Sequence, residues 1–180
     1  MEIRLSDMRY EEIKKLIVDM LIRYGICCVP ISGFEIASKM GIKVIPYSAF
    51  PPNKRVLLLM KSEDGFSVEK EKGEWYIFYN DNCDYGRINN TIMHEIGHIV
   101  LDHTEDSELA EKEVKFFAKY ALAPPALVHR LGINDPQGIA DYFDVSFQAA
   151  GYAFNYYQKW LYRGGDYYKD YELRLLKQFA

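Results

Sequence analysis

The sequence predicts an α+β fold in which two helices, a small sheet and a helical half follow one another along the chain. Three observations support this fold class. Apolar residues recur at helical spacing in residues 7–24, segments with strand composition alternate with turn residues through residues 42–79, and helical spacing returns after Asn80. The chain has 180 residues, which is enough for a single domain with its own hydrophobic core.

Two helices are expected on the N-terminal side, at residues 7–24 and 33–40. Gly25 and Gly41 directly follow them, and glycine is common where a helix ends. Ser32 precedes the second helix, where a serine side chain can accept a hydrogen bond from an N–H group of the first turn.

Four strands are expected from composition, at residues 42–46, 55–60, 66–69 and 74–79. The segments between them contain proline, asparagine, aspartate or glycine, which are typical of turns. Because short turns separate the last three strands, we expect these to form an antiparallel meander. The fold class is therefore α+β with a small antiparallel or mixed β-sheet.

The second half of the chain is expected to be helical. Its predicted helices cover residues 90–103, 108–122, 125–131, 136–143, 147–163 and 167–179. Ser107 and Ser146 stand where helix caps are needed, and Pro124 with Pro125 should stop the preceding helix. We expect residues 1–123 to form the core and residues 124–180 to form a helical C-terminal subdomain within the same folding unit.

Composition argues against several classes of protein. Asp and Glu outnumber Lys and Arg by 26 to 22, and no basic run occurs, so direct nucleic-acid binding is not expected. No segment approaches the ~18 apolar residues of a membrane span, and none has the apolar core of a secretion signal, so a cytoplasmic location is expected. The cysteines, Cys27, Cys28 and Cys83, are odd in number and include no Cys-x-x-Cys pair, so we expect buried thiols.

The segment from His94 to His98 is a candidate metal-binding motif. It reads His-Glu-Ile-Gly-His within a predicted helix. Residues four apart differ by about 40° around a helix, so both imidazoles stand on one face and can bind one metal ion. Glu95 lies about 60° to the other side of His98, where it can reach a water held by that ion. This arrangement is typical of a metal-assisted hydrolase with Glu95 as general base.

Catalytic zinc needs a third protein ligand and one open position. On a continuous helix His103 would lie about 180° from His94, which excludes it as that ligand. A carboxylate on the next helix is the better candidate. Glu113 lies within the apolar stripe of that helix, where a carboxylate is costly unless it is paired or metal-bound. Glu108 and Glu111 lie nearer the lysines and are expected on the solvated face.

Together these residues resemble the ImmA/IrrE family of metallo-endopeptidases. Matching stretches run in order through most of the chain: residues 36–42, Asp64-Gly-Phe66, Tyr79-Asn-Asp81, residues 87–103, residues 111–118 with Pro124, and residues 142–150. The His-Glu block is the specific part, and the order of the other stretches adds weight. The chain departs from the family at Val114-Lys115, where Ala-Asn is usual, and at residues 121–123, where Leu-Leu-Met is usual.

The resemblance implies a zincin-like fold and a gluzincin-like zinc site. Carried onto this sequence, the implied metal ligands are His94, His98 and Glu113, with Glu95 as the base. The implied substrate is a protein, a helix-turn-helix repressor of a mobile element or of a stress regulon.

Two other functions compete with a zinc endopeptidase. A non-catalytic zinc-binding module that sequesters a regulatory partner would need no carboxylate beside the metal, so Glu95 argues for the enzyme. A DNA-binding regulator is suggested by residues 35–42, which resemble part of a helix-turn-helix. However, residues 43–46 are expected to form a strand where the recognition helix should begin.

Overall fold

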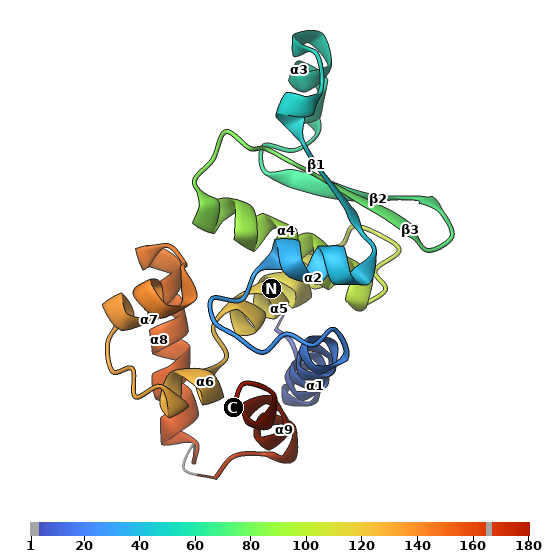
Figure 1. Ribbon diagram of the computed structural model, residues 1–180. Coiled ribbons are helices and arrows are strands. Elements are labelled where there is room, and N and C mark those ends of the chain that lie inside the picture. The colour runs from blue at the N-terminus through green and yellow to red at the C-terminus, as the bar shows by residue number, and fades with distance from the viewer. Residues whose placement is uncertain (1–3, 165–166) are drawn as a thin grey trace.

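The computed structural model describes residues 4–164 and 167–180. Figure 1 shows a small sheet lying along α4, with α3 beyond the sheet and most of the other helices on the opposite side of α4. In chain order the elements are α1 (Asp7–Arg23), α2 (Gly33–Met40), β1 (Lys43–Pro46), the 3-10 turn η1 (Tyr47–Ala49), α3 (Pro52–Lys61), β2 (Gly65–Glu71), β3 (Glu74–Tyr79), α4 (Tyr85–Val100), α5 (Glu108–Leu122), α6 (Pro125–Arg130), α7 (Pro136–Phe143), α8 (Phe147–Tyr162) and α9 (Asp170–Gln178). The α+β fold class is confirmed.

Several helices begin or end at the capping residues that the sequence predicts. The side chains of Ser32, Ser107 and Ser146 each accept a hydrogen bond from a backbone N–H three residues later. Gly41 ends α2 with φ 76°, a left-handed conformation that favours glycine. Local capping chemistry therefore sets these boundaries.

The sheet within the described residues has three strands in the order β1-β3-β2. β2 and β3 form an antiparallel hairpin, whereas β1 runs parallel to β3, with Val44 opposite Ile77. The sheet is therefore mixed. β2 has a neighbour on one side only, which leaves its other edge open.

The predicted strand at residues 55–60 is wrong, because these residues belong to α3. Pro52 occupies the first turn of this helix, where a missing N–H costs nothing. The error arose because a run of consecutive apolar residues has no period that separates a strand from a helix. None of the residues of α3 is buried, and Leu57 and Met60 are 64% and 78% exposed.

One buried cluster draws on both predicted parts of the chain. Ile13, Ile92 and Phe117 precede residue 123, Phe143 and Leu175 follow it, and all are fully buried in the same core. The division at residue 123 stays a prediction. No described helix is long and apolar enough to span a membrane.

The expectation of buried thiols is wrong. Cys27 and Cys28 are exposed and Cys83 is partly exposed. In the loop between α1 and α2, Ile26 and Ile31 fill the core instead, which leaves the two adjacent cysteines outside.

Candidate metal centre

α4 carries the two histidines of the motif on one face, as their spacing predicts. Asp84 caps this helix by accepting a hydrogen bond from the N–H of Arg87. The ring centroids of His94 and His98 are 5.0 Å apart, and their side chains are 20% and 15% exposed. Both rings therefore reach a partly buried site from one helix face.

Two packing features fix α4 in place. Asn89 is buried, and its side chain accepts a hydrogen bond from the N–H of Gly33 at 2.6 Å and donates one to the carbonyl of Ile31 at 3.0 Å. On the other side, a Cβ at Gly97 would lie 3.0 Å from Phe117 Cδ1. The absence of a side chain at residue 97 thus lets α5 pack closely against the histidine helix.

This close packing brings Glu111 of α5 to the two histidines. Its Oε2 lies 3.6 Å from His94 Nε2, and its Oε1 lies 3.2 Å from His98 Nε2. Among the described residues, these three form the group whose ligand atoms all lie within 4.8 Å of one another. We expected Glu111 on a solvated face, and its side chain is indeed 41% exposed, but its carboxylate oxygens lie beside the two imidazoles.

Glu113, the third ligand that the sequence predicts, lies outside this group. Its oxygens accept hydrogen bonds from Arg9 Nε at 2.7 Å and Arg9 Nη2 at 2.6 Å. Its Oε2 also lies 2.9 Å from His103 Nε2. The hydrogen bonds from Arg9 hold the pKa of Glu113 below its ordinary value. The expectation that a buried carboxylate here needs a partner was right, but the partner lies on α1.

His103 lies nearer the site than a continuous helix would allow. α4 ends at Val100, and Asp102 then adopts φ 54°, which turns the chain back. The N–H of His103 bonds to the carbonyl of His98, and the Nδ1 atoms of the two rings are 3.2 Å apart. A usable sequence signal was Asp102, because aspartate tolerates the left-handed conformation better than most residues.

The three grouped side chains fit a zinc ion. Zinc is bound tetrahedrally by histidine nitrogen and carboxylate oxygen at about 2.0–2.2 Å, so neighbouring donor atoms should lie ~3.4 Å apart. The distances of 3.6 Å from His94 Nε2 to Glu111 Oε2 and of 3.2 Å from His98 Nε2 to Glu111 Oε1 lie on either side of that value. Burial lowers the pKa of both imidazoles, which favours the neutral form that binds metal.

Glu95 lies with His98 and Glu111 of this group in one open cleft, which has a volume of about 470 Å³ and is also lined by Ser67. Its carboxyl is buried at 8% exposure, and Ser67 Oγ donates a hydrogen bond to its Oε2 at 2.7 Å. Burial raises the pKa of Glu95 to about 7, against the opposing effect of the Ser67 hydrogen bond. A carboxylate with that pKa can accept and return a proton near neutral pH.

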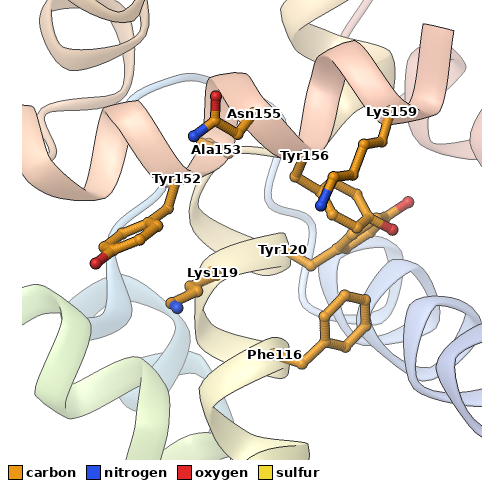
Figure 2. A pocket seen from close by; sticks show the side chains of 9 residues that line it. Phe116, Lys119, Tyr120, Tyr152, Ala153, Asn155, Tyr156 and Lys159 are labelled. Carbon is orange, nitrogen blue, oxygen red and sulfur yellow. The ribbon is translucent and has the colours of Figure 1, made fainter. Parts of the chain in front are cut away.

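A second hollow lies between α5 and α8 and has a volume of about 290 Å³. Figure 2 shows Lys119 and Tyr152 at one end and Tyr156 and Lys159 at the other. Its described lining contains no histidine and no carboxylate, so it offers no donor set for a metal ion.

Comparison with known proteins yields one family. A family model described as the IrrE N-terminal-like domain, Peptidase_M78, matches residues 37–155. The matched segment spans more than half of the chain and contains both histidines, Glu95 and Glu111. A search of curated proteins gives no match.

Proposed function

The chain belongs to the Peptidase_M78 family of IrrE N-terminal-like domains, and on that basis we propose that it is a zinc-dependent endopeptidase. The proposed metal ligands are His94, His98 and Glu111, and the proposed general base is Glu95. One observation carries the proposal: His98, Glu111 and the buried carboxyl of Glu95 line one open cleft, and the ligand atoms of His94, His98 and Glu111 all lie within 4.8 Å of one another.

The chemistry divides between the metal ion and the protein. A bound zinc ion would lower the pKa of a water molecule and polarise the scissile carbonyl. Glu95 takes the proton of that water at its carboxylate and passes it to the leaving amine. Ser67 holds Oε2 of Glu95, so Oε1 is left to accept the proton. Glu113 has no part in this step, because both of its oxygens are bound to Arg9.

The open edge of β2 supports an extended peptide as substrate. β2 is an edge strand, and its residues Phe66 and Ser67 line the cleft that holds Glu95. A peptide segment can add to such an edge through main-chain hydrogen bonds, which would carry its amide bond past the proposed metal centre. The family resemblance further suggests a helix-turn-helix repressor as the protein that is cut.

The test combines metal content with cleavage of a purified helix-turn-helix repressor. Wild type should hold about one zinc per chain, whereas His98→Ala and Glu111→Ala should lose it. Glu108→Ala is the matched control, because Glu108 lies on the same helix, is exposed and should leave zinc content unchanged. Glu95→Gln should keep zinc and lose cleavage. Native cleavage by Glu95→Gln would refute the assigned base, and zinc retention by Glu111→Ala would refute the ligand set.

A non-catalytic module that binds zinc and sequesters its partner is the second candidate. A group of metal-binding side chains beside an open cleft also suits binding without cleavage. The cost of burying Glu95 favours the enzyme, because a binder gains nothing from a buried carboxyl beside the metal. Stoichiometric repressor binding by wild type without any cleaved product would favour the module.

A further inference from the structure

A row of hydrogen-bonded side chains leads from α1 to the proposed metal centre. It consists of Arg9, Glu113, His103 and His98, and we call it the imidazole row. Arg9 binds both oxygens of Glu113, Glu113 Oε2 lies 2.9 Å from His103 Nε2, and His103 Nδ1 lies 3.2 Å from His98 Nδ1. The side chains of Glu113 and His103 are only 6% and 12% exposed, so water competes little for these contacts.

The order of the row determines where its protons lie. Glu113 receives two N–H donors from Arg9, so it acts as a carboxylate acceptor, and His103 Nε2 must donate to it. We take His103 as a neutral imidazole with its single N–H on Nε2, which leaves Nδ1 as an acceptor. The contact between the two Nδ1 atoms then requires His98 Nδ1 to be the donor.

This arrangement of N–H groups also determines the protonation of the second ring nitrogen of His98, Nε2. With its N–H on Nδ1, His98 has a bare Nε2, and this atom lies 3.2 Å from Glu111 Oε1. A bare nitrogen and a carboxylate oxygen are both acceptors and do not bond to each other. His98 Nε2 and Glu111 Oε1 can, however, both bind a metal ion placed between them.

We propose that His103 and Glu113 are positioning residues that hold His98 in the Nδ1–H tautomer and so prepare its Nε2 for the metal ion. Histidine ligands are commonly oriented in this way by a partner on the second ring nitrogen. Here that partner is a second imidazole, and the anchoring carboxylate is in turn held by an arginine of α1. The inference rests on the proposed metal centre but not on peptide cleavage.

The row is not explained by stability alone. The ion pair between Arg9 and Glu113 is partly buried, so both partners lose some hydration, and buried pairs are often no more stabilising than apolar packing. A purely structural role would also be indifferent to which nitrogen of His98 carries the proton. The tautomer of His98 is therefore the property that separates a positioning role from a structural one.

The first experiment reads that tautomer in the metal-free protein. Long-range ¹H–¹⁵N correlation spectra distinguish Nδ1–H from Nε2–H imidazoles, and the four histidines of the chain are assigned by single substitutions. We expect the Nδ1–H form for His98 and the Nε2–H form for His103. An Nε2–H tautomer at His98, or N–H groups on both nitrogens of His103, would overturn the proposal. This reading needs no metal, and the tautomers themselves are read in the wild-type protein.

The second experiment measures zinc affinity by competition with a chromophoric chelator. His103→Phe keeps an aromatic ring but removes the acceptor, and we expect zinc affinity to fall ~10–100-fold, as for other partners of metal-bound histidines. His103→Gln offers an amide oxygen to His98 Nδ1 and should recover part of that loss. His129→Phe is the matched control, because His129 bonds to Tyr168 away from the site and should leave affinity unchanged.

The outcomes separate this proposal from the proposed function. Zinc affinity in His103→Phe within about twofold of wild type would overturn the positioning role, even if the enzyme were active. If wild type bound no zinc, the metal centre itself would fail, while the tautomers would still be read in the spectra. If His103→Phe did not fold, the wild-type tautomers alone would decide.

Discussion

The buried carboxyl of Glu95 should make the metal-free protein less stable at high pH than its Glu95→Gln variant. Burial raises the pKa of Glu95 from an ordinary 4.5 to about 7. The folded state therefore holds the proton more tightly than the unfolded state, and stability falls as pH rises from about 4.5 to about 7. Above pH 7 the loss is complete.

Its size follows from the two pKa values. The gap between 4.5 and about 7, at about 1.4 kcal/mol for each pH unit, corresponds to about 3 kcal/mol. Glutamine has nearly the same shape, carries no charge and can still accept the hydrogen bond from Ser67 Oγ. The stability advantage of Glu95→Gln should thus be small near pH 4.5 and reach about 3 kcal/mol above pH 8.

Urea unfolding of both proteins in chelator, at several pH values from 4.5 to 9, measures this difference directly. The imidazoles of His94 and His98 are present in both proteins, so their contribution largely cancels in the difference. Equal stabilities at every pH, or a constant offset, would show that Glu95 is not destabilised by burial. In that case the raised pKa could not be part of the mechanism.

Three further substitutions test the packing that positions the site, each by urea or thermal unfolding. Gly97→Ala should destabilise by about 1 kcal/mol, because overpacking against the fully buried ring of Phe117 outweighs the gain in helix propensity; a stabilised variant would refute the close approach of α5. Asn89→Ala should cost about 2–4 kcal/mol, since it strips two backbone groups of their buried partner; a loss below about 1 kcal/mol would show that water replaces it. Tyr120→Phe should be neutral or stabilising by about 1 kcal/mol, because the hydroxyl is buried without a partner among the described residues; a clear loss of stability would mean that this hydroxyl is bonded.

Local patterns in the sequence predicted the parts of the site that depend on one helix. The spacing of His94 and His98 was enough to place both imidazoles on one face, because helix geometry is the same in every protein. The serine caps were predicted for the same reason. By contrast, residues 55–60 were assigned to a strand because their apolar run carries no period, and only the structure shows that they extend from the core as α3.

The proposal of Glu111 in place of Glu113 as the third ligand rests on contacts that no local pattern contains. The periodicity of α5 correctly predicted that Glu113 is buried, but its partner Arg9 is 104 residues away in the chain. Likewise, His103 was excluded by the assumption of a straight helix, and the reversal at Asp102 invalidates that assumption. Tertiary packing determines which polar residues far apart in the sequence become partners, and a single sequence does not reveal that packing.

The bond between Arg9 and Glu113 also bears on how small a working fragment of this protein can be. The family match begins at residue 37, so a fragment trimmed to it would retain His94, His98, Glu95 and Glu111. It would nevertheless lack α1, leaving Glu113 without its arginine and the α1-facing side of α5 uncovered. The minimal metal-binding unit is therefore expected to begin at or before α1, because the N-terminal helix supports the proposed site even though it contributes none of the proposed ligands.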